Sequence, residues 1–321
     1  MLRRRFLKGS AALAAFVVAG PGLIRSARAE TFINVLTGGT SGVYYPLGVA
    51  MANLFTQKIE DVNAQAQATK ASVENLNLLQ QGKGELALTL GDAASQAWAG
   101  VAEAGYPAKL DKLRHVAGAY NNYVQIVASA ESGIKTLADL KGKRISVGAP
   151  KSGTELNARA VLGAAGISYD DFAKVEYLPF GESVDLMKNR QLDVTLQSAG
   201  LGVGSIKDLA VSVPIVIVPI PADVIEKIGD AAYSANVIPA GTYQGQTADI
   251  ATASIQNLLL THSEVAEELV YQMISVIFGN LDTLVAAHSA AKGIKLDANT
   301  PTGPIPLHPG AERFYKEQGI L

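Results

Sequence analysis

The chain has 321 residues, of which 48% are hydrophobic and 17% are charged, and its formal net charge is −2. It contains no cysteine, so disulfides, thiol nucleophiles and cysteine metal sites are excluded. It also lacks the basic excess that marks nucleic-acid-binding proteins, and its length suffices for two lobes that each bury a core.

Residues 1–29 have the composition of an export signal. A basic start at Arg3–Lys8 precedes an apolar stretch, and Ala27–Ala29 reads A-x-A, the pattern of a cleavage site. We therefore expect cleavage after Ala29 and a periplasmic mature protein. Arg3–Lys8 also resembles the twin-arginine motif, so Sec and twin-arginine export both stay open. These residues hold six of the 27 Lys and Arg and none of the 29 Asp and Glu, which leaves residues 30–321 with a formal charge of −8.

The remaining chain alternates strand-like and helix-like segments, a pattern that predicts an α/β fold. Up to residue 129, the expected strands are Phe32–Leu36, Asn63–Thr69, Glu85–Leu90, His115–Tyr120 and Tyr123–Ser129. The helices expected between them are Tyr45–Lys58, Ala71–Gln81 and Ala93–Ala104.

The alternation continues through the middle of the chain. The strands expected there are Arg144–Val147, Val175–Leu178, Val194–Gln197 and Val211–Ile220. The helices expected there are Thr136–Leu140, Glu155–Ala165 and Ser183–Asn189. After residue 220 we expect mainly helix, above all over Val265–His288, and then a Pro/Gly-rich tail over Thr300–Gly310.

Two loops rich in Gly, Ser and Thr each connect a predicted strand to a predicted helix. They are Thr37–Tyr45 and Gly148–Glu155. The first N–H groups of a helix have no acceptor within the helix, and the helix dipole is positive at the same end, so such a loop can receive an anion. Two loops of this kind in separate α/β units predict a ligand held between two lobes.

The search for catalytic and metal-binding motifs finds little. The chain has no nucleophile elbow, P-loop or complete G-x-G-x-x-G, and its four histidines lack metal-ligand spacing. Asp92 follows a predicted strand and precedes a helix, a position that favours helix capping over acid catalysis. We therefore expect no metal ion, no cofactor and no enzymatic activity.

Four motifs together resemble the TAXI family of TRAP transporter solute-binding proteins. They are Gly38–Gly48, Ala71–Leu76, Ser152–Glu155 and Leu307–Tyr315. The resemblance implies a bilobal periplasmic binding protein fold of type II, in which two α/β lobes close on a ligand. Strands near Tyr120–Val127 and Val211–Val218 would cross between the lobes. Lobe 1 would comprise residues 30–123 and 217–321, and lobe 2 residues 124–216.

The same resemblance, read with the two loops, gives a set of expected ligand-binding residues. Ser152 and Thr154 can cap a helix and bind a ligand at once. Tyr44 can be a pocket wall or part of the core, and each lysine can meet a carboxylate or face solvent. The full set is Thr40, Ser41, Gly42, Tyr44, Lys70, Ser72, Asn75 and Asp92 from lobe 1, with Lys151, Ser152, Gly153 and Thr154 from lobe 2.

The implied function is that of an extracytoplasmic receptor for a small carboxylate, such as glutamate, 2-oxoglutarate or a related dicarboxylate. Its implied partners are this anionic solute and the integral membrane subunits of an ion-driven TRAP transporter. Two alternatives stay open. A binding protein of an ATP-driven importer would share the fold and the anion-binding loops, and a periplasmic enzyme would need catalytic motifs that the sequence lacks.

Overall fold

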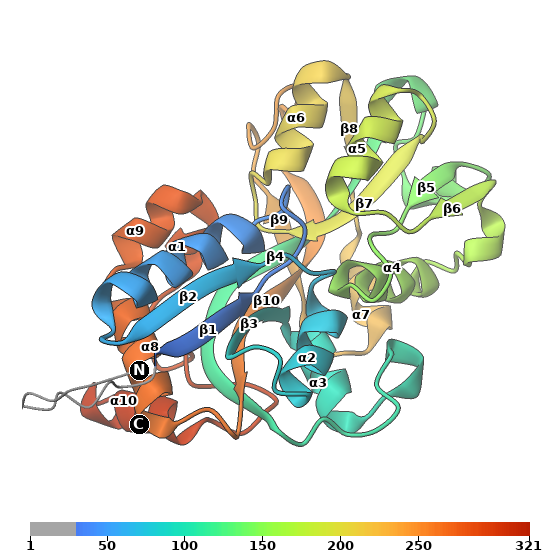
Figure 1. Ribbon diagram of the computed structural model, residues 1–321. Coiled ribbons are helices and arrows are strands. Elements are labelled where there is room, and N and C mark those ends of the chain that lie inside the picture. Colours follow the sequence, from blue (N-terminus) through green and yellow to red (C-terminus); the bar gives the residue numbers. More distant parts are fainter. Residues whose placement is uncertain (1–29) are drawn as a thin grey trace, which may run out of the picture.

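The computed structural model describes residues 30–321, so the predicted export signal and its cleavage site lie outside the described residues. Within these residues, no single helix is long and apolar enough to cross a membrane, and one pair of consecutive helices passes that test only together, across a bend of 69°. The chain forms two α/β lobes that share one sheet (Figure 1). The two-lobed α/β fold predicted from the sequence is therefore confirmed.

Ten strands and ten α-helices make up the described part of the chain. The strands are β1 (Thr31–Leu36), β2 (Val62–Gln67), β3 (Leu86–Leu90), β4 (Leu113–Ser129), β5 (Arg144–Ser146), β6 (Lys174–Glu176), β7 (Val194–Ala199), β8 (Ile215–Val218), β9 (Tyr233–Ile238) and β10 (Ile250–His262). The α-helices are α1 (Tyr44–Lys58), α2 (Ser72–Gln80), α3 (Gly91–Ala99), α4 (Gly153–Ala164), α5 (Phe180–Lys188), α6 (Gly204–Ser212), α7 (Ala222–Ile228), α8 (Glu267–Phe278), α9 (Leu281–Ala287) and α10 (Pro309–Glu317). The 3-10 turns are η1 (Ala102–Ala104), η2 (Ala130–Ser132), η3 (Leu137–Leu140), η4 (Tyr169–Asp171) and η5 (Ser289–Gly293).

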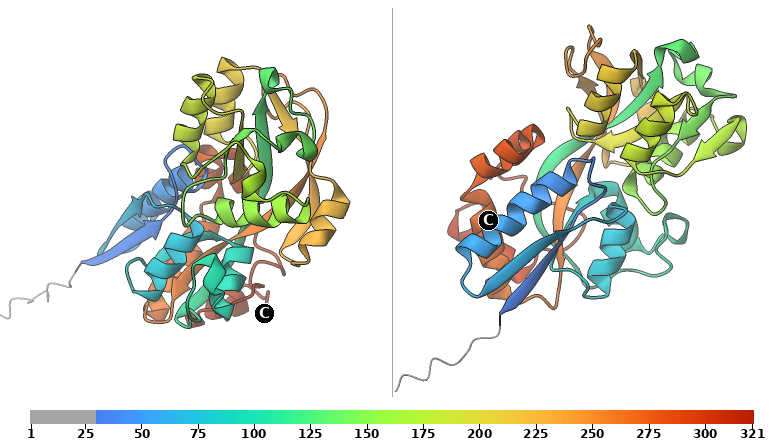
Figure 2. Two further views of the ribbon diagram at one scale, coloured as in Figure 1. Left: turned by 90° about the vertical axis from the view of Figure 1, so that its right-hand side faces the viewer. Right: turned by 45° about the horizontal axis from the view of Figure 1, so that its top comes forward.

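The strand order separates the two lobes. It runs β2-β1-β3-β10-β4-β7-β5-β6, with β8 also pairing with β4 and β9 with β10. We call the part built on β1–β3 and α1–α3 the first lobe, and the part built on β5–β8 and α4–α6 the second lobe (Figures 1 and 2). Each has a parallel ladder of its own, and the long antiparallel strands β4 and β10 lie between them. The residue boundaries of the lobes given above stay a prediction.

Strand β4 is continuous where the sequence predicts two strands around Asn121 and Asn122. Paired asparagines favour turns, but here the Asn122 side chain supports the sheet. Its Nδ2 donates to the Ser198 carbonyl at 2.9 Å, and its Oδ1 accepts from Asn257 Nδ2 at 2.8 Å. One 17-residue strand therefore passes through both lobes.

The expected second crossing strand at Val211–Ile220 is wrong. Its first two residues end α6, and β8 pairs only with the last four residues of β4. The second crossing is made by β10, in a region for which helix was expected. Strand β10 pairs with β3, β4 and β9, and its register against β4 shifts between Gln256 and Leu258 and again between Leu259 and Leu260. The first shift flanks Asn257, whose side chain bonds to Tyr44 and Asn122 where the two lobes meet.

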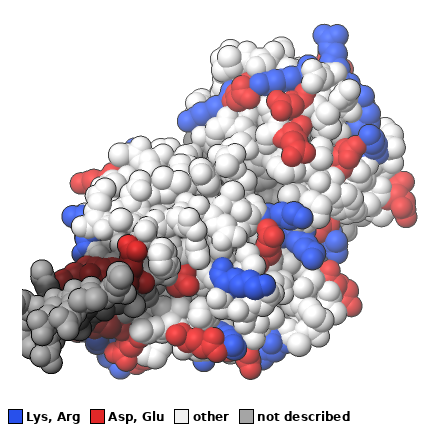
Figure 3. All heavy atoms as spheres, in the orientation of Figure 1, with Lys and Arg blue, Asp and Glu red and all other residues white. Residues whose placement is uncertain are grey.

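Helices cover both faces of the shared sheet. On one face, α1, α8, α9 and α10 pack over the first lobe, and α5 and α6 pack over the second. On the other face, α2 and α3 lie beside α4 and α7. Over α1, the face shown in Figure 3 is largely free of charged side chains, whereas Lys and Arg side chains, with an acidic side chain among them, stand beside the boundary between the lobes. Because helices of both lobes cover the sheet on each face, several of them begin at the boundary between the lobes.

Candidate functional site

A pocket of about 100 Å³ lies between the two lobes. A single water needs about 10–15 Å³ of such space, so the pocket can hold a small solute. Its walls come from the first lobe, from the crossing strand β4 and from the second lobe. The lining residues are Gly38, Gly39, Gly42, Val43, Tyr44, Thr69, Lys70, Ala71, Ser72, Leu90, Tyr120, Asn122, Ala149, Ser152, Gly153, Thr154, Pro179, Phe180, Ser198 and Ala199.

Four helices begin at this pocket. Tyr44, Ser72, Gly153 and Phe180 are the first residues of α1, α2, α4 and α5, and all four line it. The opening N–H groups of each helix have no acceptor within the helix, and the positive end of each dipole lies there too. Two of the starts belong to each lobe, so the pocket offers backbone donors and positive potential from both sides.

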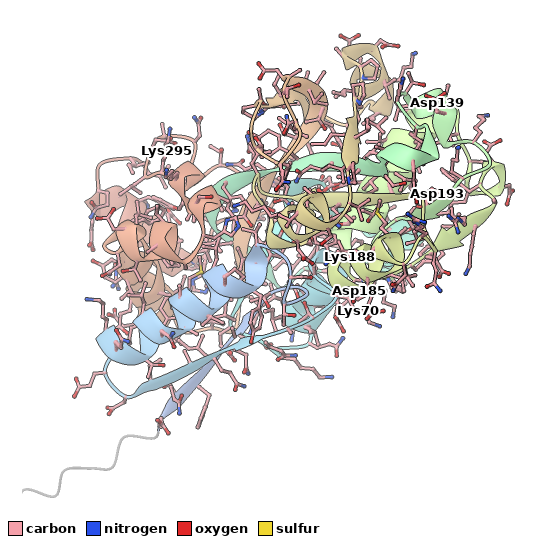
Figure 4. The ribbon with its side chains drawn as sticks, turned by 90° about the horizontal axis from the view of Figure 1, so that it is seen from above. Lys70, Asp139, Asp185, Lys188, Asp193 and Lys295 are labelled. Carbon is pink, nitrogen blue, oxygen red and sulfur yellow. The ribbon has the colours of Figure 1, made fainter. Side chains whose placement is uncertain are left out.

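The charged side chain of the described pocket wall has the same sign as the helix ends there, which are positive. Lys70 is the one charged side chain among the described residues that line it, and no carboxylate is among them. Lys70 itself is exposed at the rim, and in projection it lies next to Asp185 and Lys188 of α5 (Figure 4). A wall with one cation, no anion and several helix starts favours a ligand that carries one negatively charged group.

The second loop packs directly against the first lobe. Ser152 caps α4, because its Oγ accepts from the Glu155 N–H at 3.2 Å. The Glu74 N–H donates to the Lys151 carbonyl at 3.2 Å, which ties the loop to α2. A Cβ at Gly153 would lie 2.6 Å from Leu90 Cδ1 and 2.7 Å from Ser72 Oγ. The lobes are therefore in contact beside the pocket.

The first loop contributes less than the sequence predicts. Thr40 is exposed and Ser41 half-buried, and neither lines the pocket. Gly42 and Tyr44 do line it. The Tyr44 hydroxyl donates to Asn257 Oδ1, and the ring is also buried in the core, so Tyr44 both lines the pocket and packs in the core. Its role in ligand binding stays a prediction.

Asn75 lies behind the pocket wall, where it holds the first lobe together. Its Nδ2 donates to the carbonyls of Thr37 at 2.7 Å and Leu88 at 2.8 Å, and its Oδ1 accepts from Thr69 Oγ1 at 2.6 Å. All three contacts fix the path of the first loop and of β3. Asn75 therefore positions the wall and does not line the pocket.

Asp92 also lies behind the wall, in a buried cluster between the lobes. Its Oδ2 accepts from Asn157 Nδ2 of α4 at 2.7 Å and from the Tyr233 hydroxyl of β9 at 2.8 Å. Complete burial raises the pKa of Asp92 to about 6. The expected capping hydrogen bond is absent at the start of α3. Asp92 thus links lobes instead of capping a helix or lining the pocket.

Of the two lysines expected at the site, Lys70 and Lys151, one lines the pocket and the other does not. Lys70 lines the pocket, whereas Lys151 is exposed, does not line it, and has a φ of 61°. A positive φ strains a residue with a Cβ, and the carbonyl of Lys151 is the group that bonds across the lobes. The expected pair of cations, one for each end of a diacid, is therefore not present at the pocket.

Several residues that line the pocket were not predicted from the sequence. Tyr120 and Asn122 come from β4, Phe180 from the start of α5, and Ser198 from the end of β7. None belongs to a Gly-rich loop. The one available signal was position, since Ser198 lies at the carboxyl end of a strand that leads into Gly200, and ligand sites of α/β folds gather at such ends.

Comparison with known proteins adds a family and a fold. A model of the NMT1-like family matches residues 35–319. The structure of PhnD1 from Prochlorococcus marinus, in complex with methylphosphonate, has a TM-score of 0.58 at 12% identity, with 90% of this chain and 99% of that chain covered. A binding component of an ABC phosphonate transporter from Pseudomonas aeruginosa gives 0.52 at 14%, covering 83% and 80%. A putative L-cystine ABC transporter protein from Listeria monocytogenes gives 0.52 at 13%, covering 83% and 98%.

At these identities the solved structures show the fold alone, and they confirm the bilobal periplasmic binding protein fold. They and the family match also correct the family expected from the motifs, so the TAXI assignment is wrong. The expected TRAP membrane partner and the expected dicarboxylate ligand, including glutamate and 2-oxoglutarate, are therefore wrong as well. The physical reason is that Gly/Ser/Thr-rich helix starts bind anions in many folds, so such motifs do not identify one family.

Proposed function

The chain belongs to the NMT1-like family, and from this premise we propose that it is the extracytoplasmic solute-binding protein of an ATP-driven importer. Its ligand is a small solute with one anionic group. The observation that carries the proposal is the pocket between the lobes, where four helices begin and Lys70 is the one charged side chain of the described wall.

The proposed mechanism is capture by closure, without chemistry. The anionic group is held by N–H groups at the starts of α2 and α4, one from each lobe. Only the closed form offers both sets of donors, so the ligand shifts the population toward closure. The closed form then docks on the membrane subunits of the importer. The ATP-driven class is supported by relatives of the same fold that are described as ABC transporter components.

Ligand class is tested with the mature protein, residues 30–321, by calorimetric or fluorescence melting. The screen contains methylphosphonate, short carboxylates, neutral sugars and cationic amines. A ligand at a thousandfold excess over its Kd adds about 4 kcal/mol, and each kcal/mol raises Tm by about 2–4 °C in a chain near this size. We expect rises with solutes that carry one anionic group. Rises only with neutral or cationic solutes would contradict the proposal, and NMR of the recovered solute would reveal any conversion.

Coupling to ATP is tested by uptake in cells with and without this gene. We expect uptake of the solute found in the melting screen to require the gene, to stop when cellular ATP is depleted, and to survive collapse of the ion gradients. Uptake that stops with the ion gradients while ATP is maintained would overturn the ATP-driven class and leave solute capture standing.

A further inference from the structure

We propose that the bound solute carries, besides its anionic group, an uncharged hydroxyl or carbonyl oxygen that the hydroxyls of Tyr120 and Ser198 bind. This inference rests on the proposed function and names a narrower class of solute for the same pocket. Both residues line the pocket, and both belong to strands and not to helix starts.

The two hydroxyls are buried without a partner. Tyr120 is 2% exposed and Ser198 is 5% exposed. Neither hydroxyl has a hydrogen-bond partner within residues 30–321. A buried polar group without a partner costs free energy that a ligand oxygen in the pocket would recover. Because hydroxyls both donate and accept, they suit an uncharged oxygen.

Neighbouring polar groups already have partners in the protein. The Tyr44 hydroxyl donates to Asn257, and Ser72 Oγ accepts from the Leu90 N–H. The Asn122 amide is held between Asn257 and β7. Among these side chains, Tyr120 and Ser198 are the ones whose hydroxyls make no hydrogen bond at all within the described residues.

The surroundings of Tyr120 disfavour a second charge. Burial raises the pKa of Tyr120, and the nearby Tyr44 phenol raises it further, so the group stays a neutral donor. The described pocket wall offers Lys70 as its one cation, and that side chain is exposed at the rim. A second anionic group beside Tyr120 would be buried without a counterion. The second polar group of the solute is therefore uncharged.

The test measures the affinity of matched solute pairs by isothermal titration calorimetry. Glycolate is compared with propionate, and hydroxymethylphosphonate with ethylphosphonate, so that each pair shares its anion and its size. We expect the wild-type protein to bind the hydroxyl member at least tenfold more tightly. Tyr120→Phe and Ser198→Ala each should reduce that ratio at least threefold, because each removes one hydroxyl oxygen.

Tyr106→Phe is the matched control. Tyr106 is a fully buried tyrosine whose hydroxyl also has no partner within the described chain, but it does not line the pocket. We expect it to leave the ratio unchanged. A ratio, unlike a single affinity, is insensitive to a loss of folded protein, and Ser198→Ala provides a second reading if Tyr120→Phe folds poorly.

The outcomes separate this inference from the proposed function. Equal binding of both members of a pair, or a preference that survives both variants, overturns the role of the two hydroxyls and leaves anion capture intact. Silence toward these pairs and toward every other anion, with a response to neutral or cationic solutes, overturns the proposed function itself.

Discussion

The two Gly/Ser/Thr-rich loops look alike in sequence and are used differently in the fold. The first leads into α1 without a side-chain cap at Val43, and its Thr40 and Ser41 stay outside the pocket wall. The second leads into α4 behind the Ser152 cap and brings three consecutive residues, Ser152–Thr154, into the wall.

The difference comes from what each loop faces. The second loop meets the start of α2 across the lobes, so that Gly153 lies against Ser72. The first loop faces α5, where a Cβ at Gly42 would still be 3.8 Å from the ring of Phe180. A helix-start pattern in a sequence thus locates N–H donors, but contact across the lobes decides which donors can close on a solute.

The largest effect is expected from Gly153→Ala. The new methyl group would overlap Ser72 and Leu90, and overpacking of this kind costs about 1–3 kcal/mol. Because these contacts join the lobes, the cost falls on the closed form. We expect solute affinity to fall by about ten- to a hundredfold with little change in Tm of the free protein, measured by calorimetry.

Two other glycines serve as controls for that change. Gly163 lies in the same helix with no atom within 4 Å of an added Cβ, so Gly163→Ala should leave affinity unchanged. Gly39, in the first loop, also has free space around it, and Gly39→Ala should weaken binding less than Gly153→Ala does. Equal losses at Gly39 and Gly153 would remove the distinction between the loops.

The next effect is a pH dependence of stability, which comes from the contact between Asp92 of α3 and α4. The Asp92 carboxyl, which binds Asn157 of α4, has a pKa raised by burial from 3.8 to about 6. A raised carboxyl pKa contributes stability that is present below pH 3.8 and is lost as the pH rises through about 6. The full loss amounts to about 3 kcal/mol, of which about 2 kcal/mol falls between pH 4 and pH 7, where denaturant unfolding measures it.

Asp92→Asn isolates this contribution, because asparagine does not titrate. The free energy of unfolding of the variant should therefore rise relative to that of the wild type between pH 4 and pH 7. The difference between the two proteins matters, because His115 acts in the opposite sense. Burial lowers the His115 pKa to about 4, so His115 makes both proteins less stable as the pH falls. Parallel curves for wild type and Asp92→Asn would show that the Asp92 carboxyl is not the source.

A smaller effect separates the two loop serines. Ser152 caps α4 through its hydrogen bond to the Glu155 N–H, and the loss of such a cap costs about 1 kcal/mol. Ser41 caps no helix, since the cap position of α1 is Val43. We expect Ser152→Ala to lower the free energy of unfolding by about 1 kcal/mol and Ser41→Ala to change it by less than about 0.5 kcal/mol. Equal losses would mean that the loops are capped alike.

The smallest effect concerns the two lysines. Lys70 lines the pocket but is exposed, so its attraction for an anion is screened by solvent and contributes at most about 1 kcal/mol. We expect Lys70→Gln to weaken anion binding two- to fivefold, which corresponds to at most about 1 kcal/mol. The effect should fade at high salt. Lys151→Gln should change affinity by less than twofold, and a larger loss there would restore a second cation to the site.

Much of the fold could be predicted, because most elements carry a local signal. The first three strands and the helices that follow them lie within a few residues of their expected positions. Strand β10 could not be predicted this way. It is buried over most of its length, so its apolar residues do not alternate, and the run Leu258–Leu260 resembles part of a helix.

The site was only half predictable for a different reason. Helix starts are local features, and Ser72, Ser152 and Thr154 were therefore found. Tyr120 and Ser198 enter the pocket through the pairing of β4 with β7, which residues far apart in the sequence decide. Lys151 misled because its side chain points into solvent while its carbonyl makes the contact.

The register shift in β10 between Gln256 and Leu258 gives the junction of the lobes a place to bend. A shift of this kind bends a strand without rupture of the ladder on either side, and it lies at the junction of the lobes. Hinge motions of intact domains run in microseconds to milliseconds, far faster than motions that require local unfolding. Under the proposed capture mechanism, opening of the lobes would be a hinge motion of this kind, so a solute held between them would meet no unfolding barrier before it leaves.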